Sequence, residues 1–202
     1  MMSGVLRMLP NSEGWARMKI VVICLALALL GACASVPPVD FTVQDVGVVE
    51  DRKNAELKSL TVGFAPQSQQ GVVEANATIP PLWKEALTDA LNRSLIFKDD
   101  VDRKINLSVR IVEFDAPAGG FSMTTTVGAI YEVVDRSNGD LLYSELIKSE
   151  GVVPANYAFM GVTRAVESWN RAVRNNIADF IASITLADFS KPAFPAKVLS
   201  KK

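Results

Sequence analysis

The fold is decided by the stretch FSMTTTVGAIYEVVDRSNGDLLYSELI, residues 121–147. Over its first half apolar side chains alternate with small or polar ones, and a period of two is typical of a strand with one buried face. Asn138-Gly139 comes next, which is the strongest short signal for a tight turn between antiparallel strands. Residues 141–147 then return as a second strand, so the stretch predicts a β-hairpin.

Two further strands and two helices are predicted around this hairpin. Residues 105–111 alternate cleanly, and the alternation changes phase at 112–114, which indicates a β-bulge. Residues 60–64 alternate as well and form the first predicted strand. Apolar side chains recur every three or four residues in 80–97 and in 162–184, which is the spacing of an amphipathic helix.

The resulting order is strand, helix, three strands, helix (β-α-β-β-β-α). It predicts an α+β fold, in which an antiparallel sheet of about four strands carries two helices packed on one face. We expect this globular domain to span residues 57–187. A Pro-containing tether, residues 33–56, precedes it, and a basic flexible tail, residues 188–202, follows it.

The first 32 residues have the features of a signal peptide. Lys19 precedes an apolar run, residues 20–30, that is too short to cross a bilayer comfortably. The run ends in Leu30-Gly31-Ala32-Cys33, which resembles the lipobox of bacterial lipoproteins. In proteins with this motif the Cys thiol receives a diacylglycerol, the signal peptide is removed before the Cys, and the new amino group often receives an acyl chain such as palmitate.

Cys33 is therefore the predicted lipidation site and the first residue of the mature chain. Translation from Met1 or from Met18 would give the same mature protein. Residue 34 is Ala rather than Asp, which by analogy with enterobacterial lipoproteins predicts an outer-membrane anchor with the domain in the periplasm. The alternatives are an ordinary cleaved signal peptide or an uncleaved anchor.

The composition excludes several classes of function. The 202 residues include no His, which excludes Ser-His and Cys-His nucleophile pairs and His-containing zinc sites. The net charge of −1 gives no general attraction to nucleic acid. Three groups of carboxylates occur, and solvated surface positions explain them better than acid–base chemistry or calcium binding: Asp99, Asp100 and Asp102; Glu113 and Asp115; Glu145 and Glu150. The sequence therefore predicts no enzyme, no metal site and no cofactor.

The predicted loop at 151–161 is rich in large apolar residues. It contains Tyr157, Phe159 and Met160, residue types that are enriched at protein interfaces. These three residues are the candidate partner-binding site. The alternative is that they cap one end of the core.

The lipobox, the helix after Pro80-Pro81, the Asn138-Gly139 hairpin and the terminal helix together resemble those of small periplasm-facing lipoproteins. The groups are the YajG-like lipoproteins and the auxiliary lipoproteins of ABC-type lipid transporters, and the resemblance covers residues 57–187. It implies a non-catalytic, membrane-anchored lipoprotein that binds an envelope protein, as an auxiliary subunit of a transport or assembly system. A binding module for a small lipid or apolar ligand is the alternative, and a hydrolase that uses only carboxylates is a third hypothesis.

Overall fold

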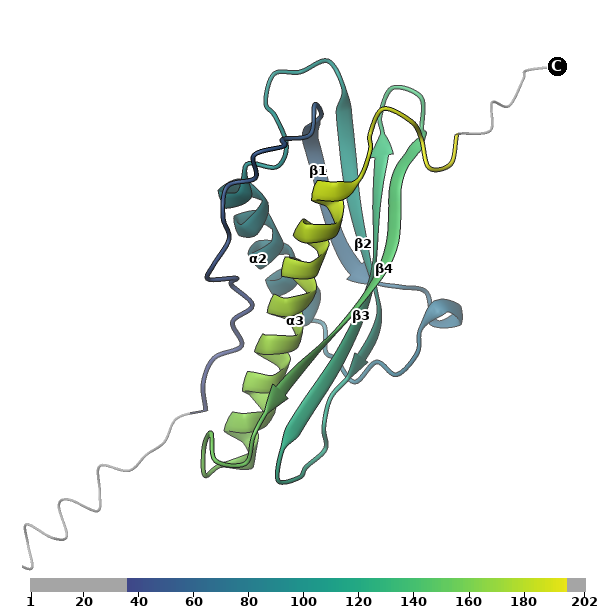
Figure 1. Ribbon diagram of the computed structural model, residues 1–202. Coiled ribbons are helices and arrows are strands. Elements are labelled where there is room, and N and C mark those ends of the chain that lie inside the picture. Colours follow the sequence, from purple (N-terminus) through teal and green to yellow (C-terminus); the bar gives the residue numbers. More distant parts are fainter. Residues whose placement is uncertain (1–35, 196–202) are drawn as a thin grey trace, which may run out of the picture. The chain divides into compact units, whose positions relative to one another are not determined.

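Among residues 36–195, which the computed structural model describes, four strands and two long helices follow one another in the predicted order (Figure 1). The elements are β1 (Glu56–Phe64), α2 (Ile79–Ser94), β2 (Lys104–Asp115), β3 (Met123–Asp135), β4 (Leu141–Val153) and α3 (Gly161–Leu186), with a short 3-10 turn, η1 (Gln67–Gln69), between β1 and α2. The predicted α+β class is confirmed.

The sheet has the strand order β1-β2-β3-β4. Two hairpins make β2, β3 and β4 antiparallel to one another. In contrast, β1 is parallel to β2, whereas the sequence analysis expects an antiparallel sheet throughout. The reason is the crossover. Helix α2 carries the chain back along the sheet, so that β2 begins at the same end of the sheet as β1 and runs in the same direction.

The predicted β-bulge in β2 is confirmed at residues 111–113, where the pairing with β3 shifts register. Val112 and Phe114 are both buried, at 8% and 0% exposure. Gly128 lies opposite the bulge, and a Cβ added there would come within 3.2 Å of the Glu113 Cβ. The glycine therefore gives the bulged strand room. The turn of the next hairpin also forms as predicted, with Gly139 at a φ of +81°.

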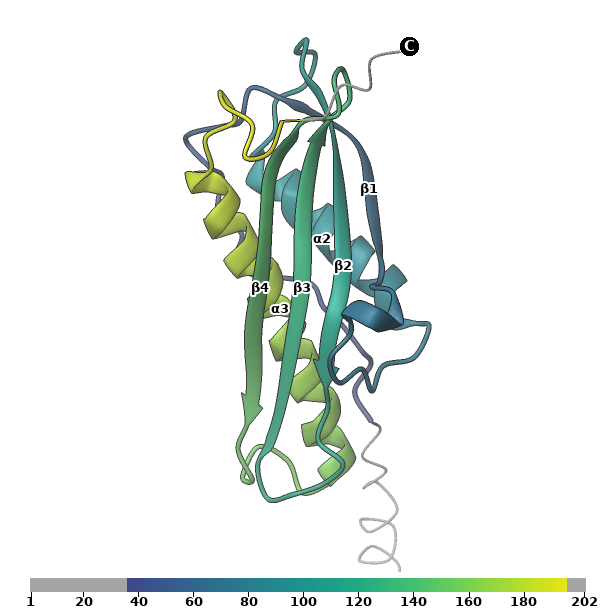
Figure 2. The ribbon, with the colours of Figure 1, turned by 90° about the vertical axis from the view of Figure 1, so that its right-hand side faces the viewer.

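Both helices lie on one face of the sheet, and the other face is open (Figures 1 and 2). The core between them is aromatic: the Tyr131 ring of β3 stacks on the Phe180 ring of α3 with 4.1 Å between centroids. Trp83 of α2 is fully buried in this core. Ion pairs such as Arg110–Glu132 occupy the open face, so this face is suited to water.

Side chains of α3 also make polar contacts with the sheet. The buried Tyr131 hydroxyl donates to the Asn176 Oδ1 at 2.8 Å, and the Asn176 Nδ2 donates to the Ile147 carbonyl at 2.9 Å. Burial raises the pKa of Tyr131, which keeps its hydroxyl protonated as a donor. The Thr125 and Ser168 hydroxyls share a further buried hydrogen bond of 2.7 Å. Since an unpartnered buried polar group is costly, these contacts fix the position of α3 along the sheet.

The packed unit extends beyond the predicted domain boundaries of 57 and 187. On the N-terminal side, Phe41 is 2% exposed and lies edge-on to the Trp83 ring, while the Arg174 guanidinium of α3 donates to the Asp40 carbonyl at 2.7 Å. This segment bridges α2 and α3, which make few contacts with each other. On the C-terminal side, Phe189 is buried, and Phe194 pairs with Leu141 at the start of β4. The predicted signal peptide, Cys33 and residues 196–202 lie outside the described residues.

An ion pair between Glu56 and Lys104, at the start of the parallel strands β1 and β2, predicts a small pH dependence of stability. Glu56 of β1 faces Lys104 of β2, and hydrogen bonds from Lys104 and Lys58 lower the pKa of Glu56 from 4.5 to about 2. The ionised carboxylate therefore stabilises the fold above about pH 4.5, and this contribution is lost as the pH falls toward 2. We expect the melting temperature to fall less between pH 7 and pH 3 in Glu56→Gln than in the wild type. An equal fall in both proteins would contradict the assignment.

Candidate binding surface

The candidate residues lie at one end of the molecule, where the β2–β3 loop (residues 116–122) meets the β4–α3 loop (residues 154–160) (Figure 1). Phe159 is 102% exposed and Phe121 is 89% exposed. We call this surface the apolar tip and define it by six exposed residues: Phe121, Val152, Tyr157, Phe159, Met160 and Val162. None of the six belongs to the core, so the core-capping alternative has no support.

One arginine joins the two loops of the tip. The Arg164 guanidinium donates to the carbonyls of Ala158 (2.6 Å) and Phe159 (3.0 Å) on one loop. It also donates to the Gly120 carbonyl (3.2 Å) on the other loop. These bonds hold Phe121 and Phe159 at the same end although 38 residues separate them in the sequence.

A second arginine supports Tyr157. The Arg171 guanidinium lies over the Tyr157 ring, 5.1 Å from its centroid, and donates to the Val152 carbonyl at 2.9 Å. Glu167 pairs with the same guanidinium at 2.9 Å. A cation over an aromatic face is an attractive contact. The ring is therefore oriented by α3, while 48% of the residue stays exposed.

Three members of the tip, Tyr157, Phe159 and Met160, are predicted from the sequence, whereas Phe121 is not. The alternating pattern places Phe121 inside the third predicted strand, but β3 begins only at Met123, so Phe121 falls in the preceding loop. Its neighbours Gly119-Gly120 are the signal that could have placed it there, because such a pair seldom continues a strand. The other predicted site residue, Cys33, lies outside the described residues.

Two of the candidate carboxylates, Glu113 and Glu145, have structural partners. Glu113 pairs with Lys148 at 2.6 Å on the open face of the sheet, and Glu145 accepts a hydrogen bond from the Tyr143 hydroxyl at 2.8 Å. Within residues 36–195, no three Cys, Asp or Glu side chains converge as metal ligands would. Nor does any helix in this range have the length and apolarity needed to cross a bilayer.

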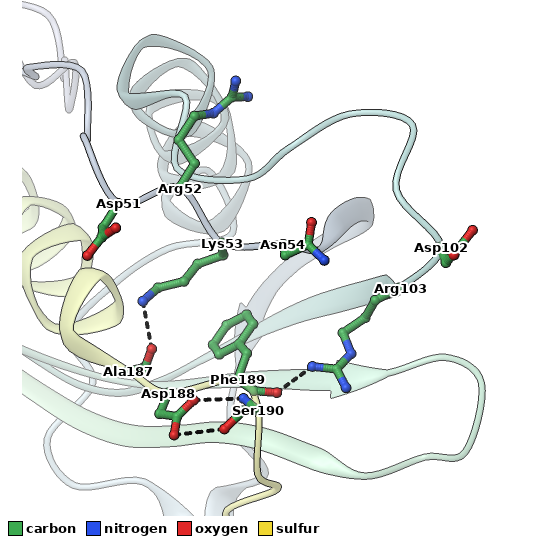
Figure 3. Close-up of a pocket in the computed structure, with 10 residues that line it drawn as sticks. All are labelled: Asp51, Arg52, Lys53, Asn54, Asp102, Arg103, Ala187, Asp188, Phe189 and Ser190. Carbon is green, nitrogen blue, oxygen red and sulfur yellow. Dashed lines mark hydrogen bonds between the residues drawn. The ribbon is translucent and has the colours of Figure 1, made fainter.

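A polar cavity of about 530 Å³ lies at the opposite end of the molecule (Figure 3). Its cations already bind backbone carbonyls: the Lys53 Nζ donates to Thr185 (2.7 Å) and Ala187 (2.6 Å), and the Arg103 guanidinium donates to Phe189. These bonds attach the segment before β1 and the α2–β2 loop to the end of α3. The cavity therefore lies between chain segments that these bonds hold together, and Lys53 and Arg103 are already engaged with backbone carbonyls.

Two smaller hollows have apolar linings. One, of about 300 Å³, lies between α3 and the segment before β1; it is lined mainly by Val43, Val46, Val49, Ala178 and Ile181. The other, of about 290 Å³, is lined by Phe114, Ile79 and Trp169 among others. Both are at the lower limit of the volumes that small-molecule sites have.

Comparison with protein-family models and with curated protein sequences finds no match for this chain. Solved structures match at the level of the fold. A Xanthomonas campestris protein of the family designated DUF330 superposes with a TM-score of 0.50 at 12% identity, over 72% of this chain and 92% of that chain. At this identity the likeness shows a shared fold.

Two other solved structures are less similar. A Caulobacter crescentus protein, provisionally described as a lipoprotein, gives a TM-score of 0.38 at 15% identity, over 65% of this chain and 88% of that chain. PelC from Paraburkholderia phytofirmans, solved as a dodecamer, gives 0.36 at 13% identity, over 66% and 91%. Scores this low carry no argument about function.

Proposed function

We propose that this chain is a non-catalytic lipoprotein, anchored to the outer membrane through Cys33, with its domain in the periplasm. There it binds a partner of the cell envelope and serves as an auxiliary subunit of a transport or assembly system. The apolar tip is the observation that carries the proposal. Six exposed apolar residues gathered at one end form the kind of surface by which proteins bind a partner.

The chemistry of the described residues supports binding rather than catalysis. One carboxylate of each candidate acid–base pair is engaged on the sheet: Glu113 with Lys148, and Glu145 with Tyr143. Tyr, Phe and Met are enriched at protein interfaces, and aromatic residues are equally at home at the boundary between membrane and water. The composition of the tip alone therefore fits either a protein subunit or a lipid surface.

Anchoring is tested by Cys33→Ala. We expect the variant to receive no lipid and either to keep its signal peptide or to be released into the soluble periplasmic fraction, because no acyl chain remains to hold it. Fractionation and intact-mass measurement of the purified protein give the readout. A shortened variant that still needs detergent for extraction would contradict lipidation at Cys33.

Partner binding at the tip is tested by a photo-crosslinking amino acid at position 162, which is 46% exposed. We expect adducts with an envelope component in cells, and their loss when Tyr157 and Phe159 are both replaced by Ser. The melting temperature of the double variant should change little, since exposed residues contribute little to stability. The same crosslinker at position 186, which is 87% exposed at the far end of α3, is the control. Adducts that persist in the double variant would contradict a role for the tip.

A binding module for a small lipid or apolar ligand is the second candidate function. It is favoured by the apolar hollow between α3 and Val43, Val46 and Val49. Native mass spectrometry of the protein extracted from membranes tests it, since a bound lipid would appear as an added mass that Ala182→Trp, which fills the hollow, removes.

A further inference from the structure

We propose that the apolar tip inserts into the lipid bilayer, so that the domain stands on the membrane that anchors it, with α3 starting at the lipid surface. The proposal rests on the anchoring at Cys33 proposed above and names the component that the tip contacts.

The first argument is the distribution of charge along the molecule. The two loops of the tip, residues 116–122 and 154–160, contain no charged residue at all. The opposite end is densely charged: Asp51, Arg52, Lys53, Asp102, Arg103 and Asp188 line one cavity there. The Lys98 backbone N–H donates to the Lys53 carbonyl of this cavity, and the Arg136 backbone N–H donates to the carbonyl of Lys104, which follows Arg103. Taking a charge into an apolar medium is costly, so only the tip end can enter lipid.

The second argument is the point where the chain enters the domain. The first described residues lie beside the N-terminal half of α3, since the Asp40 backbone N–H donates to Asn170 at 2.9 Å and Asn170 donates to the Pro38 carbonyl at 3.4 Å. The coloured ribbon in Figures 1 and 2 begins toward the end that carries the apolar tip. The chain therefore enters the described domain toward the end that carries the apolar tip.

The third argument is the length of the connection. Cys33 and Pro38, whose carbonyl accepts from Asn170, are five residues apart, so a fully extended chain between them covers at most about 18 Å. Asn170 lies nine residues beyond Gly161, the first residue of α3, which is about 14 Å along the helix axis. Because this reach is comparable with the distance to the start of α3, an upright domain can have its tip at the lipid surface while the anchor is in the membrane.

The fourth argument is the chemistry of the tip itself. Phe159 and Phe121 are suited to the layer between headgroups and acyl chains, where amphipathic surfaces bury about 5–10 Å deep. Arg164 donates to carbonyls on both loops and so keeps the two aromatic side chains at the same end, where both can enter the lipid. The acyl anchor raises the effective concentration of the tip at the membrane, so even a shallow insertion is populated.

The test uses the lipidated protein purified from membranes and phosphatidylcholine vesicles whose acyl chains carry bromine, which quenches tryptophan fluorescence on contact. Phe159→Trp places a probe at the tip, and Leu186→Trp places a matched probe at the other end of α3. The native Trp83, fully buried, and Trp169, partly buried, set the wild-type baseline. Flotation of the vesicles measures anchoring separately from quenching.

We expect brominated lipid to quench at least about half of the fluorescence that Phe159→Trp adds, because the tip lies within the expected insertion depth. The fluorescence that Leu186→Trp adds, at the other end of α3, should not be quenched. Vesicle-bound protein without quenching at position 159 would overturn this inference and leave the anchor intact, with a protein as the occupant of the tip. Quenching at both positions would overturn the upright orientation. Failure of the wild-type protein to float would overturn both the anchoring at Cys33 and this inference.

Discussion

Gly151→Ala is expected to destabilise the protein by about 3 kcal/mol or more, because the added Cβ has no room. It would lie 2.1 Å from the Ser168 carbonyl oxygen and 2.4 Å from the Ala172 backbone nitrogen. Both atoms belong to the backbone of α3, so a side-chain movement cannot relieve the clash. The whole helix would have to leave β4, and the hydrogen bond between Ser168 and Thr125 would break.

Urea denaturation of the wild type and the variant measures this effect. Gly63→Ala in β1 is the matched control, since a Cβ there meets no atom within 4 Å. We expect Gly63→Ala to change the free energy of unfolding by less than about 1 kcal/mol, and to stabilise rather than weaken the strand. A Gly151→Ala variant as stable as this control would show that α3 does not approach β4 as closely as the structure describes.

Phe180→Ala is expected to cost about 3–5 kcal/mol of stability, because it empties the centre of the core. The Phe180 side chain is fully buried. Its ring stacks on Tyr131 at 4.1 Å between centroids and lies edge-on to Tyr143 at 6.0 Å. Truncation therefore removes contacts between α3 and two strands at once. The near-ultraviolet circular dichroism of the tyrosines should weaken with it.

The control for this second variant is Phe194→Ala. Phe194 is 64% exposed and pairs with Leu141 through backbone atoms, which alanine retains. Its replacement should change stability by no more than about 0.5 kcal/mol. If Phe180→Ala were as mild as Phe194→Ala, the aromatic core between α3 and the sheet would contribute far less than its burial indicates.

Gly151 and Phe180 account for two ways in which α3 packs on the sheet. A glycine lets the helix backbone approach β4, and an aromatic stack fills the wider space over β3 and β4. The edge strand benefits too, because Arg171 and Asn175 of α3 donate to the outward carbonyls of Val152 and Glu150 at 2.9 and 2.8 Å. An edge whose carbonyls are already bonded is a poorer template for pairing with another chain.

The amino-acid sequence by itself determined the elements and their order. The hairpin at Asn138-Gly139, the bulge after Ile111 and the apolar face of α3 follow from short-range periodicity and turn chemistry, which depend on residues close together in the chain. Tyr157, Phe159 and Met160 are predicted as a partner-binding site from their residue types alone; the structure shows them exposed, and their role in binding is a proposal. The lipobox at Cys33 is equally local, and its role is a proposal that fractionation will test.

Only the tertiary structure decided how distant segments meet. The direction of β1 depends on where α2 returns the chain, and the burial of Phe41 depends on a space between α2 and α3 that no local pattern encodes. Phe121 and Phe159 form one surface because Arg164 binds carbonyls on both loops. Such contacts join residues far apart in sequence, and their energies depend on three-dimensional packing that periodicity along the chain does not contain.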